Sequence, residues 1–229
     1  MNKNVITFGD SIMFGIVVNP DNMRYVKPKE YSLHEIGMQK GFSLTNLSKM
    51  GRDSKDGLKV VKEYIESHGA PEYAVVEYGG NDCTYNWSEL SINPAKENGR
   101  PRVELLDYVD NLKQITTLLQ ENGSKVYYMN LPPIDSERHL DWIVKDGLNK
   151  NNILSFLGSA DTIKRVHSEY NAEMEKLAKT LNVQILDVRE KFNSVECLSD
   201  YISIDGVHPS RIGLKLIQEE ISEFLDKIS

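Results

Sequence analysis

The sequence is poor in cysteine, in basic residues and in long apolar runs, and each shortage argues against a class of protein. Only two cysteines, Cys83 and Cys197, occur in 229 residues. They cannot form the disulfide framework of a secreted scaffold, and their scarcity is typical of a reducing compartment. Lysine and arginine number 27 against 34 aspartates and glutamates, giving a formal net charge of -7. Because nucleic-acid binding requires clustered basic side chains, this balance argues against a nucleic-acid partner.

Membrane, secretory and metal-binding signals are also missing. No apolar run approaches the roughly 20 residues that cross a bilayer, so we expect no membrane insertion. The first residues pass directly into a short strand pattern, without the longer apolar segment and cleavage site of a secretory signal. The five histidines show no His-x-x-x-His spacing and there is no Cys-x-x-Cys, so we expect neither a metal nor a cofactor. With 40% hydrophobic and 27% charged residues, the chain has a globular composition, and we expect it to be cytoplasmic.

Short apolar runs alternate with amphipathic segments along the chain. The apolar runs predict five strands, at residues 5–8, 42–47, 73–78, 125–131 and 183–188. Helical periodicity separates or follows them, at residues 32–40, 54–67, 104–121, 162–181 and 209–228. This alternation predicts an α/β fold with a parallel sheet covered on both faces, in a single domain over residues 1–229. Two long stretches, 83–103 and 132–159, fit poorly, and such connections are usually functional loops or contain small helices.

A serine follows the first expected strand, in the motif Gly9-Asp10-Ser11. Open α/β sheets build their sites just beyond the carboxyl ends of their strands, which is where Ser11 lies. A helix N-cap explains the motif equally simply, because Asp or Ser before a helix satisfies a free backbone N–H. No Gly-x-Ser-x-Gly occurs, so the nucleophile elbow of the α/β-hydrolases is excluded.

Near the other end of the chain, Asp205-Gly-Val-His208 precedes Pro209. His208 is the only histidine with an acid three residues before it. A serine nucleophile needs an imidazole to take its proton, and the imidazole needs a carboxylate to hold its tautomer. A turn that begins a helix would explain the Asp, the Gly and the Pro but leaves the histidine unexplained.

Two further polar turns follow the third and second strands. Gly79-Gly80-Asn81-Asp82 is either a glycine turn with an Asx cap or a loop that presents the Asn81 amide to a developing oxyanion. Gly51 is either an ordinary loop glycine or a second backbone donor to that oxyanion. Because the carboxyl ends of parallel strands share one edge, these turns, Ser11 and His208 can converge on one cleft.

In their order and placement, the four blocks resemble the SGNH hydrolases, also called GDSL esterases and lipases, over nearly the whole chain. The resemblance implies a three-layer α/β/α sandwich whose five-stranded parallel sheet has the flavodoxin-like order 2-1-3-4-5. It implies Ser11 as nucleophile, His208 as general acid and base, and Asp205 as the carboxylate that orients His208. It also implies an oxyanion hole formed by the backbone N–H groups of Ser11 and Gly51 and the side-chain amide of Asn81.

Four residues are weaker candidates for substrate contact: Asp10, Tyr85, Trp87 and Trp142. The three aromatic side chains either form an apolar or sugar-stacking wall or anchor the long loops onto the body of the protein. The polar character of residues 84–93 favours a sugar over a long acyl chain.

We therefore expect a serine ester hydrolase that cleaves small or medium acyl esters through an acyl-enzyme, with carbohydrate O-acetyl esters favoured. A lysophospholipase or acyl-thioesterase with the same triad is the alternative enzyme. A catalytically silent binding protein would lack a triad residue, and none is missing. A flavodoxin-like nucleotide or flavin binder would need a phosphate cradle after the first strand, where Asp10 places a carboxylate. The expected partner is a small-molecule ester.

Overall fold

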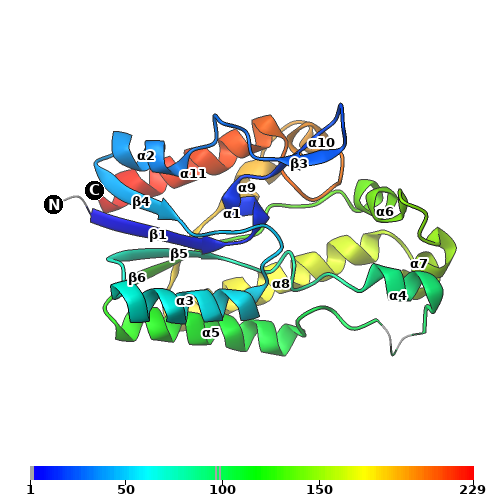
Figure 1. Cartoon of the computed structure of the whole chain (residues 1–229), viewed down its shortest axis with the longest axis horizontal. Helices are drawn as coiled ribbons and strands as arrows, with labels where there is room; N and C mark the ends of the chain where they lie inside the picture. The colour runs from blue at the N-terminus through cyan, green and yellow to red at the C-terminus, as the bar shows by residue number, and fades with distance from the viewer. Residues whose placement is uncertain (1–2, 96, 98) are drawn as a thin grey trace.

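The central feature of the fold is a parallel β-sheet (Figure 1). It is seen in a computed structural model that describes residues 3–95, 97 and 99–229. The five strands of the sheet are β1 (Lys3–Gly9), β4 (Phe42–Asn46), β5 (Tyr73–Glu77), β6 (Lys125–Met129) and β7 (Gln184–Leu186). All neighbouring pairs are parallel, and the spatial order is β4-β1-β5-β6-β7. Counted along the chain, this is the order 2-1-3-4-5, so the predicted sheet is confirmed.

Helices cover both faces of the sheet, which gives the three predicted layers (Figure 1). One layer contains α2 (Leu33–Gln39), α9 (Val188–Asn193) and α11 (Arg211–Ile228). The other contains α3 (Ser54–His68), α5 (Leu105–Glu121) and α8 (Asp161–Leu181). Successive residues of a strand point to opposite faces: Val5 packs in one core with Ile217 of α11, and Ile6 packs in the other with Ile115 of α5. Burying both faces explains why the strands are almost continuously apolar.

Side-chain caps fix where several helices begin, including those that border the carboxyl edge of the sheet. Asp10 Oδ1 accepts a hydrogen bond from Ile12 N at 2.8 Å, at the start of the short helix α1 (Ser11–Phe14). Asp53 caps α3 by accepting from Asp56 N at 2.9 Å. Each cap satisfies a backbone N–H that has no partner within its helix, which is worth about 1 kcal/mol.

The remaining elements gather at the end of the molecule on the right of Figure 1. They are β2 (Val17–Asn19), β3 (Arg24–Val26), α4 (Trp87–Ile92), α6 (Ser136–Val144), α7 (Lys150–Leu157) and α10 (Leu198–Tyr201). The two stretches that fitted poorly, 83–103 and 132–159, thus contain the small helices α4, α6 and α7, which share a third core around Leu90 and Leu140. The antiparallel β2–β3 hairpin was not predicted, because its strands are only three residues long.

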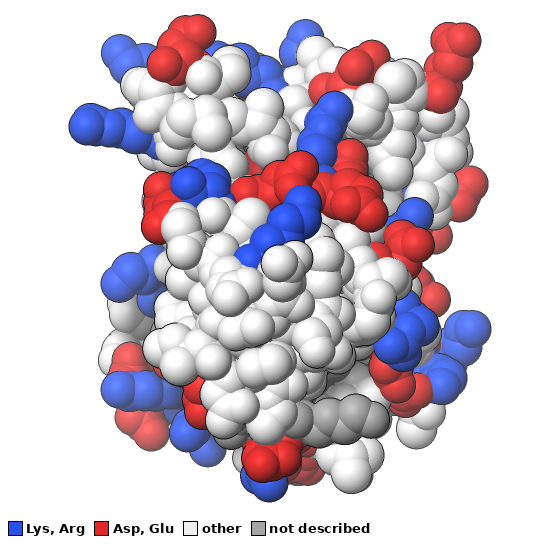
Figure 2. All heavy atoms as spheres, turned by 90° about the vertical axis from the view of Figure 1, so that its right-hand side faces the viewer, with Lys and Arg blue, Asp and Glu red and all other residues white. Residues whose placement is uncertain are grey.

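Figure 2 shows the surface of this end, which carries α4, α6 and α7. Acidic and basic side chains surround its rim, acidic side chains gather across its middle, and the lower half is largely uncharged. Helix α7 contributes a single charged side chain, Lys150. Within the residues that the structure describes, no helix combines the length and apolar character of a membrane span.

Candidate active site

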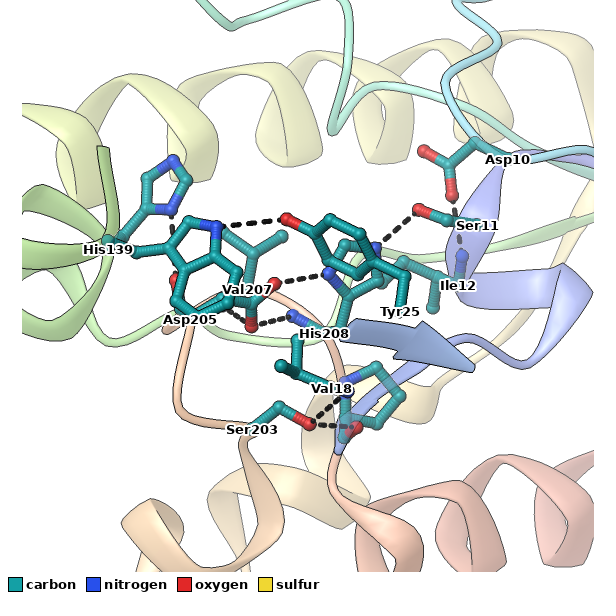
Figure 3. Close-up of polar contacts among 12 residues, drawn as sticks. Asp10, Ser11, Ile12, Val18, Tyr25, His139, Ser203, Asp205, Val207 and His208 are labelled. Carbon is teal, nitrogen blue, oxygen red and sulfur yellow. Dashed lines mark hydrogen bonds and ion pairs between the residues drawn. The ribbon is translucent and has the colours of Figure 1, made fainter. Parts of the chain in front are cut away.

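Ser11, His208 and Asp205 lie in a hydrogen-bonded line at the carboxyl edge of the sheet (Figure 3). His208 Nε2 lies 2.8 Å from Ser11 Oγ, and His208 Nδ1 lies 2.5 Å from Asp205 Oδ2. Because the carboxylate accepts the Nδ1 hydrogen, the Nε2 lone pair is directed at the serine hydroxyl. All three residues are buried. The structure therefore brings together the three predicted catalytic residues in the arrangement of a serine hydrolase triad.

The loop from Asp205 to His208 is held by its own backbone. Asp205 Oδ1 accepts hydrogen bonds from the backbone N–H groups of Val207 at 3.2 Å and His208 at 3.1 Å. Burial raises the pKa of Asp205, but the hydrogen bond and charge of His208, together with these N–H groups, outweigh burial and lower it overall. Gly206 has a φ of 75°, and a Cβ there would lie 2.4 Å from the carbonyl oxygen of Asp135. Only glycine fits this turn.

The β2–β3 hairpin covers His208. Ser203 Oγ accepts from Val18 N at 3.3 Å and donates to the carbonyl of Pro209 at 2.8 Å, which ties the hairpin to the histidine loop (Figure 3). The Tyr25 ring lies edge-to-face with the His208 ring, with centroids 5.1 Å apart. Trp142 Nε1 donates to the Tyr25 hydroxyl at 2.9 Å. These aromatic contacts pack against the imidazole, and Tyr25 lines the same cavity as Ser11.

The predicted oxyanion donors are positioned by the loops after β1, β4 and β5. Asn81 Nδ2 donates to Asp10 Oδ2 at 3.0 Å and to the carbonyl of Arg52 at 2.9 Å, so both amide hydrogens have partners. Ser11 N lies in the first turn of α1, where a backbone N–H has no intrahelical acceptor. Gly51 has a φ of 81°, and its carbonyl accepts from Arg102 at 3.0 Å. Their roles as oxyanion donors stay predictions.

Behind the serine lies a buried pair of carboxyl groups. Glu77, at the end of β5, accepts a hydrogen bond from Asp10 N at 3.1 Å, and both side chains are buried. Burial raises the pKa of both groups, and the neighbouring Asp10 raises that of Glu77 further. Two adjacent buried carboxyls cannot both carry charge cheaply, and the pKa of Glu77 is raised well above its usual value. Glu77 is therefore the more readily protonated of the two.

A cavity of about 150 Å³ opens beside Ser11 and His208. Its polar walls include Asp10, Asn81, Thr84, His139 and His167, and its apolar walls include Leu131, Pro132, Ile134 and Val207. Of the four substrate-contact candidates, Asp10 lines this cavity. Tyr85 packs between Trp87 and Phe156 of the third core, with ring centroids 5.3 Å apart in both pairs. Trp142 contacts Tyr25 instead of the cavity, so these aromatic residues hold the loops together, and their contact with substrate stays a prediction.

Three residues beside the triad were not predicted: Tyr25, His139 and His167. Tyr25 follows a turn-rich run, Pro20-Asp21-Asn22, between two Val-containing segments, a pattern that indicates a hairpin. His167 lies on the buried face of α8, where a histidine is read as a core residue unless its partners are known. No sequence signal places His139 or His167 beside Ser11, because α6 and α8 meet the cavity only through tertiary packing.

The chain is similar to plant GDSL esterase/lipase proteins over part of their length. It is 26% identical over 175 residues to the GDSL esterase/lipase CPRD49 of Arabidopsis thaliana, covering 75% of this chain and 61% of that protein. It is 25% identical over 185 residues to the GDSL esterase/lipase WDL1 of rice, Oryza sativa subsp. japonica, covering 77% of this chain and 62% of that protein. The chain thus spans about three fifths of the length of these relatives.

Solved bacterial structures share the fold over nearly all of the chain. A lipase/acylhydrolase from Enterococcus faecalis superposes with a TM-score of 0.64 at 18% identity, covering 98% of this chain and 96% of that one. The psychrotrophic esterase EstA from Pseudoalteromonas superposes with a TM-score of 0.62 at 14% identity, covering 99% and 98%. The family profile of GDSL-like Lipase/Acylhydrolase matches residues 5–221. The chain therefore belongs to the GDSL-like lipase/acylhydrolase, or SGNH hydrolase, family.

Proposed function

We propose that the protein is a serine ester hydrolase that cleaves esters of short acyl groups through an acyl-enzyme. The observation that carries the proposal is the continuous line of hydrogen bonds from Asp205 through His208 to Ser11 Oγ. A buried serine placed 2.8 Å from an imidazole nitrogen whose tautomer is fixed has the geometry of an activated nucleophile. Family membership supports the same class of reaction.

In the first half of the reaction, Ser11 Oγ attacks the carbonyl carbon of the ester while its proton passes to His208 Nε2. The carbonyl π electrons move to oxygen and form a tetrahedral oxyanion, which the N–H groups of Ser11 and Gly51 stabilise. The Asn81 amide joins them by transferring one of its two hydrogen bonds from its protein acceptor to the oxyanion. The electron pair returns, the bond to the alcohol oxygen breaks, and His208 Nε2–H protonates the leaving oxygen. The products are a free alcohol and an acyl ester on Ser11.

In the second half, water takes the place of the alcohol. His208 Nε2 accepts a proton from the water as its oxygen attacks the acyl carbon, and then returns that proton to Ser11 Oγ as the acyl bond breaks. A carboxylic acid leaves and the triad is restored. Asp205 stays ionised and stabilises the imidazolium in both halves, because the backbone N–H groups of Val207 and His208 also hold its charge.

The size of the cavity supports a short acyl group. Pockets that hold drug-sized ligands have volumes of about 300–1,000 Å³, whereas the space beside Ser11 is about 150 Å³. Its walls alternate apolar groups with polar ones, which suits a small polar ester better than a fatty chain. An O-acetyl ester of a carbohydrate is the substrate that we favour.

A panel of p-nitrophenyl esters of increasing acyl length tests this proposal. We expect kcat/KM to be highest for the acetyl to butyryl esters and to fall steadily beyond them, because longer chains exceed the cavity. A maximum at decanoyl or palmitoyl esters would contradict the short-acyl proposal and favour a lysophospholipase. Preference for an acyl-CoA thioester over the matched oxygen ester would favour a thioesterase.

We also propose that the protein acts in the cytoplasm. Both cysteines are free, with Cys83 half-buried and Cys197 exposed, and neither is part of a disulfide. Such cysteines are typical of a reducing compartment. Fractionation of the cells that produce the protein, followed by immunoblotting, tests this directly.

A further inference from the structure

Two histidines outside the triad line the same cavity as Ser11. His139 lies on α6 and His167 lies on α8, so two separate helices contribute to one wall of the cavity. Neither is bonded to Ser11 or His208, and the proposed proton transfers do not use them. Their hydrogen-bonding states follow from their surroundings.

The tautomer of His139 is fixed by a backbone carbonyl. His139 Nδ1 lies 3.0 Å from the carbonyl oxygen of Asp205, as Figure 3 shows. A carbonyl oxygen only accepts hydrogen bonds, so Nδ1 carries the hydrogen and Nε2 carries a lone pair. Burial lowers the pKa of His139 more than the nearby Asp205 raises it, so the ring is neutral. Among the described residues, Nε2 has no partner and is left as a free acceptor.

His167 is the more unusual of the two. Its side chain is 5% exposed, and its Nδ1 is fully buried without a hydrogen-bond partner in the described part of the chain. Burial, the positive charge of Arg189 and the neighbouring His139 lower its pKa to about 3, so this ring is neutral as well. An unpaired polar group in the interior destabilises the fold, and most native proteins avoid it. His167 lines the cavity beside Ser11, and its second nitrogen, Nε2, also has no hydrogen-bond partner among the described residues. A substrate group in the cavity can therefore bond to Nε2, whereas Nδ1 is sealed off.

The hydrogen-bonding groups of His139 and His167 indicate which chemical group of a substrate would bind them. His139 offers a lone pair at Nε2, and the neutral His167 ring offers an N–H or a lone pair at Nε2, according to its tautomer. A hydroxyl group both donates and accepts, so it satisfies two such neighbours at once. A carboxylate is disfavoured, since Asp10 and Asp205 already place negative charge on the same cavity.

We propose that His139 and His167 form a hydroxyl-binding subsite that selects esters of polyhydroxylated compounds, such as sugars, over esters of simple alcohols. This inference rests on the proposed ester hydrolase function and adds the residues that recognise the substrate. The two histidines are specificity-determining residues here, because they contact a hydroxyl group that takes no part in bond breaking.

Two acetate esters that differ only in hydroxyl groups test the subsite. Glycerol 1-monoacetate and n-propyl acetate have the same three-carbon alcohol, with and without two hydroxyls. Acetate release measured at constant pH gives kcat/KM for each. We expect the wild-type enzyme to prefer the glycerol ester by about tenfold or more, as is usual when a site leaves polar groups unpaired with the wrong substrate.

Two substitutions separate recognition from folding. In His139→Asn, the amide nitrogen can still donate to the Asp205 carbonyl, but nothing replaces the Nε2 acceptor. In His167→Phe, the ring volume is retained and both nitrogens are lost. Each change should reduce the preference for the glycerol ester by about threefold to tenfold, and His167→Phe should at the same time raise the thermal midpoint, because an unpaired buried polar group is removed. The exposed His68, on α3, gives the matched control His68→Asn, which should alter neither the preference nor the rate.

The outcomes distinguish this inference from the function on which it rests. If the wild-type enzyme hydrolyses p-nitrophenyl acetate but treats the glycerol and propyl esters alike, the hydroxyl subsite is wrong and the esterase stands. The same holds if the folded His139→Asn and His167→Phe proteins both retain the full preference. If no acetate ester is hydrolysed at all, the proposed function fails and the subsite fails with it.

Discussion

The two sides of the cavity differ in how completely their polar groups are paired. One side, which we call the sheet side, is formed by the loops after β1 and β5. There Asp10 accepts hydrogen bonds from Ile12 N and Asn81, and Asn81 donates to two acceptors. The other side, which we call the helical side, is formed by α6 and α8. There His139 has one free ring nitrogen, and the His167 ring has no hydrogen bond among the described residues. Asp10 and Asn81 are therefore held by hydrogen bonds within the protein, whereas the two histidines of the helical side have unused hydrogen-bonding capacity.

This difference separates chemistry from recognition. Groups that stabilise a transition state work best when their neighbours hold them in place before substrate arrives, as Asp10 and Arg52 hold the Asn81 amide. One of these two hydrogen bonds must pass to the oxyanion. Groups that recognise a substrate instead need a donor or acceptor that the protein leaves unpaired. The following predictions test whether the two sides divide their roles in this way.

The largest effect is expected from the nucleophile on the sheet side. Ser11→Ala should lower kcat for p-nitrophenyl acetate by about four to six orders of magnitude, because covalent catalysis is lost. Ser67→Ala, an exposed position on α3, is the control and should retain full activity. Activity of Ser11→Ala within tenfold of wild type would mean that the aligned triad is not the catalytic centre.

A smaller but still large loss is expected at Asn81, the proposed oxyanion donor. Asn81→Ala should reduce kcat by about 100- to 1,000-fold with little change in KM, as expected for a donor that acts mainly in the transition state. The exposed Asn151 of α7 provides the matched control Asn151→Ala. A rise in KM with kcat unchanged would instead assign Asn81 to substrate binding and would remove the distinction between the two sides.

The mildest effect concerns the stability of the helical side at low pH. His167 has a pKa of about 3 in the folded protein against 6.5 in the unfolded chain. Between those values the unfolded state binds more protons, so the free energy of unfolding falls as pH drops through this window, by up to about 1.4 kcal/mol per pH unit. Urea unfolding of wild type and His167→Phe near pH 7 and pH 5 measures this contribution.

The difference between the two proteins is informative because other buried groups act in the opposite direction. Burial raises the pKa of Asp82 to about 7, so its contribution favours the folded state as pH falls. That contribution is common to wild type and His167→Phe and cancels in the comparison. Wild type should lose up to about 2 kcal/mol more than His167→Phe between the two pH values; equal losses would show that His167 is not buried as a neutral ring.

The sequence predicted the sheet side far better than the helical side. Ser11, Asn81, Asp205 and His208 each follow a strand, and parallel strands end at one edge, so their proximity could be inferred before any packing was known. The strand order was also confirmed. The predicted strand ends differ from the observed ones by at most two residues. The last strand, for example, was predicted at 183–188, but only the three residues of β7 pair in the sheet.

The helical side could not be predicted because it depends on packing between distant segments. His167 lies among apolar residues of α8, a pattern that indicates a core position and carries no sign of a cavity. Tyr25 reaches His208 only because Ser203 ties the hairpin to the loop before the histidine. Such contacts join residues more than 180 positions apart, which no local pattern encodes.

We infer that Ser11 is an activated nucleophile in the folded protein, and covalent labelling of this residue can test that inference. The folded enzyme is treated with a fluorophosphonate, digested and analysed by mass spectrometry, with a urea-unfolded sample and His208→Ala treated in parallel. We expect one phosphonyl adduct, on the peptide that contains Ser11, formed rapidly in the folded wild type and much more slowly in the other two samples. Folded wild-type protein that remains unlabelled at Ser11, or that is labelled no faster than the unfolded chain, would contradict it.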